Sequence, residues 1–451
     1  MRKTLFAATI LLASLGLNAQ KGTWKVYDTR TSDICGNNIS ALATDGGGAW
    51  VGTFNGLCRL KGSGWMDYAM FNEKLKNQSI NCLMVDKKGT LWVGTDDFGV
   101  VEFDGTNWTE HDDVTRRLKM KFVKEMVVDH DGVMWIGVTL GGLISYDGDE
   151  WEKYTPDDCG LLSDFILDLE VDRANRIWIT TNAGISVYNG ARWLSHTTEN
   201  SGLPDNIVPA VAIDKKNVKW FGTLKGLVRY DGETWKVWNS YNSPLPGDQV
   251  NDIVIDSEGL LWIGTNEGAA VFDGQDDWAV FTSRNSQLPA GNIYKVAIDG
   301  KGDVWFGNDQ KGLAKLSGFV LPGREPAKPP VNDLPTVGEA PAVADNTPAT
   351  PPSKPAQTRP AHQQTPSQTV DQQPKEERVR INPSLAEGYI TITMDSPKAS
   401  VEFVNNAGTT IKTVPEYRAG QKISIANMPK GMYRVIISTG RTVKKIKFNL
   451  K

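Results

Sequence analysis

The chain has 451 residues, 40% of them hydrophobic, and a formal net charge of −4. This length allows two or three domains with a sizeable core. The weakly acidic balance excludes the basic face with which proteins bind nucleic acid, so we expect no nucleic-acid partner.

The N-terminus predicts a signal peptide over residues 1–19. Arg2 and Lys3 precede an apolar run at residues 5–17, and Ala19 supplies a small residue before Gln20. This is the order of a secretory signal, and the run is shorter than the ~20 apolar residues that span a bilayer. We expect export from the cytoplasm and no membrane-spanning segment.

Tryptophan recurs with a fixed period. One series is spaced by 42 or 43 residues, and each member of a second series stands 27 residues before a member of the first. Repeats of this length with short strands and glycine turns are typical of a β-propeller. The first series is Trp50, Trp92, Trp135, Trp178, Trp220, Trp262 and Trp305, and the second is Trp65, Trp108, Trp151, Trp193, Trp235 and Trp278.

Each repeat predicts four short strands joined by tight turns. An Asp-x-x-Gly turn such as that at Asp86 follows the first strand, and a hairpin such as Asp104-Gly105 follows the third. In two repeats Asn175 and Asn217 replace the turn glycine, because asparagine also adopts the left-handed backbone. We interpret these turn residues as structural.

The seventh repeat lacks its own outer strand, whereas "GTWKVYD" at residues 22–28 has no repeat of its own. Trp24 in this segment stands 26 residues before Trp50. A closed ring covers strand edges that an open array exposes. We therefore predict an all-β protein with a seven-bladed β-propeller over residues 20–320, closed by the N-terminal strand.

The repeated phrases resemble two-component regulator propeller repeats. The resemblance rests on phrases such as "LWIGTNEGAAVFDG" (261–274) and on the connector "NSGLPDN" (200–206). Such propellers commonly form the periplasmic sensing part of hybrid histidine kinases and often recognise breakdown products of polysaccharides. The resemblance implies a recognition module. Because the sequence shows no kinase motif, we expect no phosphotransfer by this chain.

Residues 321–378 are rich in Pro, Ala, Thr and Gln and predict an extended, disordered linker. Residues 379–451 return to alternating strands and predict a small β-sandwich. This segment resembles a type IX secretion sorting domain. The resemblance rests on Asn382-Pro383, residues 401–408 and 428–433, and the lysine-rich end at Lys451. The resemblance implies the type IX secretion machinery as a partner and a secreted or cell-surface protein. The alternative is a retained β-domain.

The residues that usually carry catalysis or bind metal have structural explanations. His111 and His196 stand where other repeats have Tyr, Trp or Phe, so we expect them to pack against aromatic rings. His130 and His362 lie in a turn and in the linker. Because no cluster of ligands or nucleophile motif is present, we predict no catalytic residue, metal or cofactor. We expect the four cysteines to be unpaired thiols. They are Cys35, Cys58, Cys82 and Cys159.

The loop after each "W-x-G-T" strand varies while the strand does not. These loops should share one face with the connectors between blades, such as the one with Tyr241, and aromatic, amide and carboxylate groups there suit a sugar or peptide. The loops hold Phe54-Asn55, Asp96-Asp97-Phe98, Thr139-Leu140, Asn182, Leu224-Lys225, Asn266-Glu267 and Asp309-Gln310. The candidate ligand-binding residues are Phe54, Asn55, Asp97, Phe98, Asn182, Lys225, Tyr241, Glu267 and Gln310.

Three functions remain open. The first is a non-catalytic surface or secreted protein that binds a glycan or peptide on one propeller face. The second is an extracellular hydrolase or lyase for polysaccharides, which predicts acidic residues with perturbed pKa values at the channel. The third is a scaffold for protein interactions, which predicts a large exposed apolar patch.

Overall fold

The computed structural model describes residues 22–322, 379–384, 389–394, 397–405, 410–439 and 443–450. The predicted signal peptide and nearly all of the predicted linker lie outside these residues. The chain divides into two compact units, Met1–Asn346 and Thr347–Lys451.

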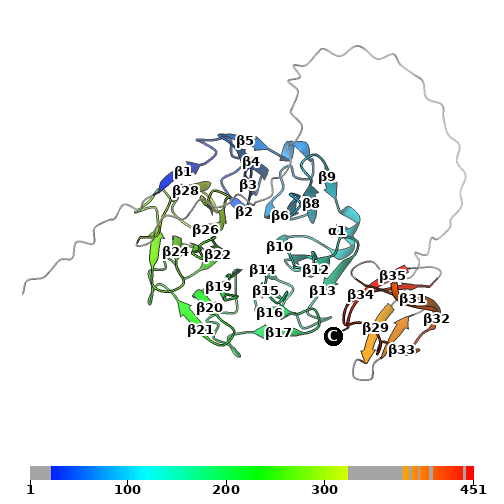
Figure 1. Ribbon diagram of the computed structural model, residues 1–451. Helices are drawn as coiled ribbons and strands as arrows, with labels where there is room; N and C mark the ends of the chain where they lie inside the picture. The colour runs from blue at the N-terminus through cyan, green and yellow to red at the C-terminus, as the bar shows by residue number, and fades with distance from the viewer. Residues whose placement is uncertain are drawn as a thin grey trace, which may run out of the picture. The chain divides into compact units, whose positions relative to one another are not determined.

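The first unit is a ring of seven four-stranded antiparallel sheets (Figure 1), which confirms the predicted propeller. The first strands of several blades line a cavity at the centre of the ring, which we call the channel. In each of blades 1 to 6, the strands follow one another from the channel outward. Blades 1 to 3 comprise β2 (Ile39–Asp45), β3 (Gly48–Thr53), β4 (Gly56–Lys61), β5 (Gly64–Asp67); β6 (Ile80–Val85), β7 (Leu91–Thr95), β8 (Val100–Phe103), β9 (Trp108–Glu110); β10 (Val123–Val128), β11 (Met134–Val138), β12 (Gly142–Tyr146), β13 (Trp151–Tyr154). Blades 4 to 6 comprise β14 (Ile166–Val171), β15 (Ile177–Thr181), β16 (Gly184–Tyr188), β17 (Trp193–His196); β18 (Ala210–Ile213), β19 (Lys219–Thr223), β20 (Gly226–Tyr230), β21 (Trp235–Trp238); β22 (Val250–Ile255), β23 (Leu261–Thr265), β24 (Gly268–Phe272), β25 (Trp278–Phe281).

Blade 7 closes the ring with the N-terminal strand, as predicted. It consists of β26 (Ile293–Ile298), β27 (Val304–Asn308) and β28 (Leu313–Ser317), with β1 (Thr23–Tyr27) outermost. Strand β1 pairs antiparallel with β28, placing Trp24 opposite Leu316. The Trp24 ring packs edge-on against Phe281 of blade 6, 5.5 Å between centroids.

The turn aspartates anchor the first tryptophan series. In blade 4, Asp172 accepts backbone N–H bonds within its turn and an indole N–H bond from Trp178 at 3.1 Å. The same indole bond forms in every blade except blade 5, where Trp220 Nε1 has no partner among the described residues. Asn175 and Asn217 have φ angles of 57° and 67°, confirming their predicted left-handed turns. One side chain thus fixes both a turn and the packing of its blade.

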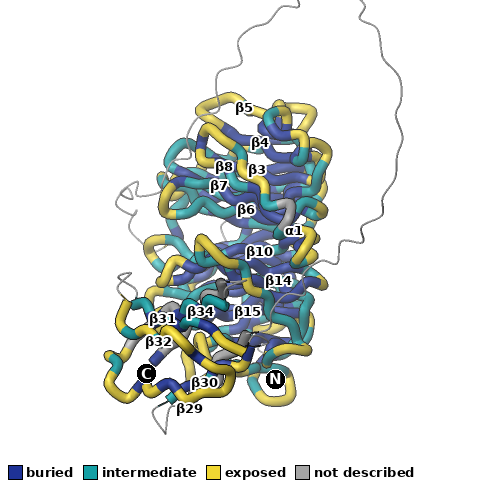
Figure 2. The backbone as a smooth tube through the Cα atoms, turned by 90° about the vertical axis from the view of Figure 1, so that its right-hand side faces the viewer, coloured by how far each residue is buried: buried dark blue, intermediate teal, exposed yellow. Residues whose placement is uncertain are grey.

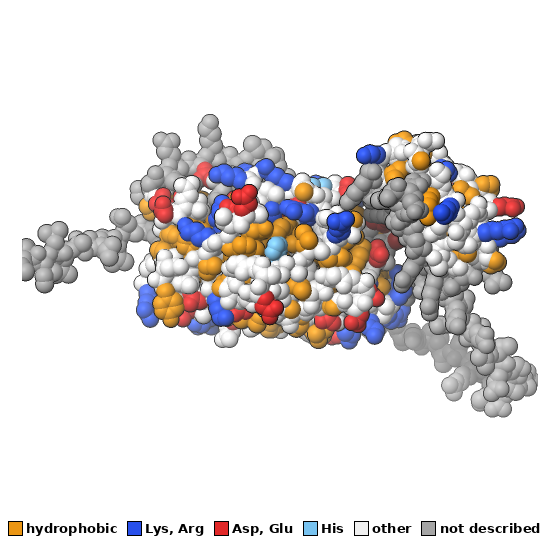
Figure 3. All heavy atoms as spheres, turned by 90° about the horizontal axis from the view of Figure 1, so that it is seen from below, with side chains coloured by type: hydrophobic (Ala, Val, Ile, Leu, Met, Phe, Trp, Pro, Cys, Tyr) orange, Lys and Arg blue, Asp and Glu red, His pale blue; other side chains and the backbone are white. Residues whose placement is uncertain are grey.

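Apolar packing fills the spaces between blades. Buried residues follow the strands and exposed ones concentrate in the turns at the two faces (Figure 2). Every member of the second tryptophan series except Trp65 stacks on a third-strand ring, as Trp151 does on Tyr146 with 4.1 Å between centroids. Hydrophobic side chains therefore form a band on the side of the propeller that carries β17 and β21 (Figure 3).

The connectors between blades contain two short helices. The 3-10 helix η1 (Ala69–Phe71) follows β5, and α1 (Asp112–Leu118) follows β9. His111 at the start of α1 stacks on Trp92, and His196 stacks on Trp178, with 6.0 and 5.8 Å between centroids. Both histidines thus occupy the predicted aromatic packing positions.

The expectation of four unpaired cysteines is wrong for two of them. Cys35 and Cys58 form a disulfide with 5.9 Å between their Cα atoms, while Cys82 and Cys159 are free. Cys35 lies in the connector that carries the chain from β1 into blade 1, and Cys58 lies in β4. Comparison between repeats missed the pair because it links a connector to a strand of one blade.

The second unit is a two-sheet sandwich. One sheet has the order β29 (Val379–Ser384), β30 (Tyr389–Met394), β33 (Ile423–Ser424), and the other β32 (Thr410–Arg418), β31 (Lys398–Asn405), β34 (Gly431–Ser438), β35 (Val443–Leu450). The sheets share one core, which includes Ile390 of the first and Phe403 of the second. The Tyr417 hydroxyl in β32 accepts a bond from the Ile392 N–H in β30 at 2.6 Å. The predicted sandwich is therefore present.

Candidate ligand-binding site

In three adjacent blades, the residue that follows the second strand is either an aromatic residue or an aspartate. Phe54, Asp96 and Asp309 each directly follow the second strand, in blades 1, 2 and 7 respectively. Asp96 and Asp309 are held alike, because the N–H of each donates to a connector carbonyl at 3.3 Å. The Phe54 side chain is 56% exposed. An exposed aromatic ring thus lies on the blade between two blades with carboxylates.

These three residues line a cavity of about 830 Å³, which we call the mouth cavity. Nine of its fifteen lining residues carry an amide or a carboxylate, and it reaches inward to the first strands. The lining residues are Asn38, Ile39, Ser40, Phe54, Asn77, Gln78, Ser79, Asn81, Asp96, Asp97, Lys124, Asn292, Tyr294, Asp309 and Gln310. The volume falls within the range of ~300–1,000 Å³ that is usual for small-molecule sites.

Hydrogen bonds fix the polar groups of the wall. Asn81 Nδ2 donates to Asp96 Oδ1 at 2.5 Å, and Asn292 Nδ2 donates to Asp309 Oδ2 at 3.1 Å. Asn38 Nδ2 also donates to the Asp309 carbonyl at 2.6 Å. Each carboxylate keeps further acceptor positions, because one oxygen can accept more than one bond. The wall is therefore a set of oriented acceptors that suit hydroxyl groups.

The structure brings together three of the nine candidate residues. Phe54, Asp97 and Gln310 line the mouth cavity. Asn55 and Phe98 belong to the same loops without lining it, and the other four lie on blades 4 to 6. Asn182 accepts a bond from Ser163, Lys225 pairs with Asp205 at 3.1 Å, the Glu267 N–H donates to Thr265, and Tyr241 is 93% exposed. A ligand role for these nine residues stays a prediction.

A second set of residues, most of them polar or ionisable, lies deeper, in the channel, and sequence analysis missed it. The first strand of every blade except β18 has a register shift near its start. In each blade, one residue of the first strand pairs with the second-strand residue that precedes the last residue of that strand. These residues always stand four before the turn aspartate, a spacing that would have revealed them. They are Ala41, Cys82, Glu125, Asp168, Ala210, Asp252 and Lys295.

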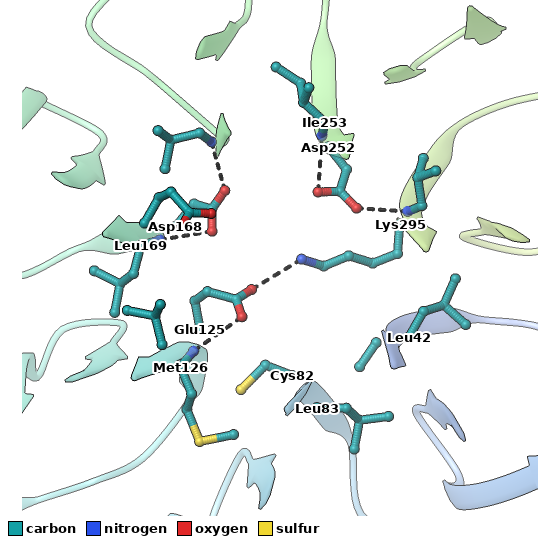
Figure 4. Close-up of a pocket in the computed structure, with 15 residues that line it drawn as sticks. Leu42, Cys82, Leu83, Glu125, Met126, Asp168, Leu169, Asp252, Ile253 and Lys295 are labelled. Atoms are coloured by element: carbon teal, nitrogen blue, oxygen red, sulfur yellow. Dashed lines mark hydrogen bonds and ion pairs between the residues drawn. The ribbon is translucent and has the colours of Figure 1, made fainter. Parts of the chain in front are cut away.

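Most of this ring lines a smaller cavity of about 220 Å³ (Figure 4). Lys295 crosses the channel to Glu125, with 3.3 Å between Nζ and Oε2. Burial alone would lower the pKa of Lys295, but the charges of Asp252, Glu125 and Asp168 raise it well above its usual value. The ammonium is therefore the fixed positive centre of the channel.

Two ring carboxylates join neighbouring blades. Asp168 accepts N–H bonds from Leu169 and, across to blade 5, from Val211 at 2.7 Å. Asp252 repeats the arrangement, accepting from Ile253 and, across to blade 7, from Val296 at 2.7 Å. Burial is the main cause that raises the pKa of each carboxyl group. These bonds give both residues a structural role.

Glu170 stands two residues after Asp168 in β14, and its pKa is also raised. Burial raises its pKa from 4.5 to about 7. Between these values the folded protein holds a proton that the unfolded chain has released, so stability falls as pH rises through this window. We expect Glu170→Gln to raise the free energy of unfolding by about 1–2 kcal/mol at pH 8 and to leave it unchanged at pH 4.

Denaturant unfolding of both proteins at the two pH values measures this difference. Glu258→Gln, at an exposed turn position, is the control and should change neither value. An equal gain for Glu170→Gln at both pH values would contradict the raised pKa.

The described residues contain no group of three or more His, Cys, Asp or Glu side chains placed to hold a metal ion. No helix within the described ranges is long and apolar enough to cross a membrane.

Comparison with known protein families matches both units. The description "two component regulator propeller" fits residues 74–97 and 244–267, and "secretion system C-terminal sorting domain" fits residues 380–451. The chain therefore contains two-component regulator propeller repeats and a type IX sorting domain. The sorting domain assigns it to the cell surface or the exterior. No curated protein matches the sequence.

Solved structures share the fold at low sequence identity. The extracellular domain of BT3049 from B. thetaiotaomicron, assigned to a hybrid two-component system, is 18% identical with a TM-score of 0.57, over 94% of this chain and 56% of that one. PorZ, a surface component of the type IX secretion system of Porphyromonas gingivalis, is 14% identical with a TM-score of 0.51, over 94% and 60%. Virginiamycin B lyase from Staphylococcus aureus is 13% identical with a TM-score of 0.53, over 66% and 99%. The chain thus spans just over half the length of the first two.

Proposed function

We propose that this protein is a non-catalytic recognition protein of the cell surface or exterior, and that its propeller binds a glycan in the mouth cavity. The observation that carries the proposal is Phe54 on the blade between those of Asp96 and Asp309. An aromatic face packs against the C–H groups of a sugar ring, while flanking carboxylates accept its hydroxyl hydrogens. The likeness to extracellular sensor propellers agrees with this role but shows the fold alone.

The channel carboxylates favour a second candidate, a hydrolase or lyase, because burial raises the pKa values of Asp168 and Asp252. Two facts weigh against it. Both carboxylates already accept two backbone N–H bonds, and the channel cavity of about 220 Å³ is smaller than usual ligand sites. Binding of a ligand in the mouth cavity is therefore the function that these observations favour over catalysis in the channel.

Phe54→Ala tests the proposal. The full-length protein is screened against an oligosaccharide array, and the affinity for the best ligand is then measured by calorimetry. We expect Phe54→Ala to weaken binding by about 10-fold or more, because the stacking surface is lost.

Leu194→Ala is the matched control, since Leu194 in β17 is exposed to 54%, nearly as much as Phe54, and lies outside the cavity. It should bind as tightly as the wild type. Binding of peptides but of no glycan on the array, or release of shortened sugars during incubation, would overturn the proposal.

A further inference from the structure

The inner wall of the mouth cavity contains a cation held across the channel. Lys124 in β10 donates from Nζ to the Tyr294 hydroxyl in β26, 170 residues away in sequence. The ammonium also lies 4.8 Å from the centre of the Tyr294 ring. Both residues line the mouth cavity, and each precedes a member of the Glu125–Lys295 pair seen in Figure 4. Successive residues of β10 and β26 thus make two cross-channel contacts, one lining each cavity.

These two lysines differ in their counter-charges. Lys295 has a carboxylate partner in Glu125, but within the described ranges no carboxylate lies within ion-pair distance of Lys124. An ammonium has three donor hydrogens, and the hydroxyl of Tyr294 takes one of them. A half-buried cation without a counter-ion is costly, so the cavity offers a favourable position for an anion.

Tyr294 adds a second donor at the same place. Burial raises the pKa of its hydroxyl, but the charge of Lys124 and the bond from its ammonium lower it, and the net effect is a pKa below the usual value. A hydroxyl that accepts a bond from a cation is a stronger donor to a third group, because hydrogen bonds in a chain polarise one another. The pair can thus give one N–H and one O–H to a single anionic group.

The carboxylates in the wall of the mouth cavity limit the kind of anionic group that can bind there. Asp96, Asp97 and Asp309 line the same cavity, although Lys121 pairs with Asp97 at 3.1 Å. They disfavour a ligand with many negative charges and favour one with hydroxyl groups and a single acid group per recognised sugar. A carboxylate has two oxygens to receive the two donors.

We propose that Lys124 and Tyr294 form a carboxylate subsite at the inner end of the mouth cavity, so that the bound glycan carries a uronic acid residue. This inference rests on the proposed function and specifies its ligand. The acid group binds Lys124 Nζ and Tyr294 Oη, while hydroxyl groups of the same sugar reach the acceptors of the outer wall.

The experiment compares matched pairs of ligands on the full-length protein. Uronate-containing oligosaccharides, their carboxyl-reduced neutral forms and sulfated neutral oligosaccharides are titrated by calorimetry. We expect each bound uronate to lose about 10-fold in affinity on carboxyl reduction. Lys124→Met should abolish this difference, because the acid and reduced forms then meet the same uncharged side chain. Tyr294→Phe should reduce the difference, and Lys124→Arg should retain it.

Lys301→Met is the control, because Lys301 is exposed in the turn after β26, at the far end of that strand from the cavity. It should keep the full preference for the uronate. Equal affinity for acid and reduced forms, or an unchanged preference in Lys124→Met, would overturn the carboxylate subsite while the proposed glycan function stands. A preference for the sulfated ligands would also overturn it. Absence of binding to all three ligand classes would overturn both proposals.

Discussion

Replacing Asp45 with alanine is expected to lower the free energy of unfolding by about 3–5 kcal/mol, because it leaves a buried arginine unpaired. Asp45 and Arg59 form an ion pair of 2.7 Å, with side chains exposed to 0% and 2%. The same carboxylate accepts bonds from the Gly47 N–H and from Trp50 Nε1. Arg59 lies over the Trp50 ring, and its Nε has no partner among the described residues.

The next blade supplies a matched control. Asp86 makes the same turn and receives the indole bond of Trp92, but Glu102 stands opposite Trp92 where Arg59 stands opposite Trp50. Asp86→Ala should therefore cost only about 1–2 kcal/mol, the usual effect of losing a capping carboxylate and one indole bond.

Urea unfolding followed by tryptophan fluorescence measures both variants. The double variant Asp45→Ala/Arg59→Met should recover part of the loss, since it removes the unpaired charge. Equal losses for Asp45→Ala and Asp86→Ala would show that the buried arginine does not carry the effect.

Removing the disulfide is expected to have the second largest effect. The bond joins residues 23 apart, for which the loop-entropy account gives about 3 kcal/mol. Cys35→Ser should therefore lower the free energy of unfolding by about 3 kcal/mol, and a reductant should do the same to the wild type. Export to the cell surface keeps the bond oxidised, because extracellular conditions favour disulfides.

The disulfide also supports the mouth cavity. It fastens the connector that carries Asn38, and the Thr53 hydroxyl directly before Phe54 lies 3.8 Å from Cys35 Sγ. We expect Cys35→Ser to weaken glycan binding as well as stability. Cys159→Ser removes a free thiol in the connector between blades 3 and 4 and is the control for both measurements. If reductant lowers the stability of Cys35→Ser further, another bond would have to account for the effect.

The sequence by itself determined the architecture. Tryptophan spacing, turn chemistry and the unmatched N-terminal strand were enough to predict seven blades and their closure, because each of these signals is local and repeats along the chain. The aromatic positions of His111 and His196 followed for the same reason. Export followed from the sorting-domain motifs, because these motifs are also local patterns of sequence.

Only the tertiary structure decided which residues meet. Lys124 and Tyr294 belong to blades 3 and 7, and their contact depends on the diameter of the closed ring. The register shift in β10 breaks the strict alternation of the strand, so the pattern did not show that Lys124 lines the mouth cavity and Glu125 the deeper one. Variable loops identified a face of the ring, but three adjacent blades form the cavity, which is why Phe54, Asp97 and Gln310 lie there and Asn182 does not. The disulfide joins segments that share no repeat position, and their proximity exists only in the folded blade.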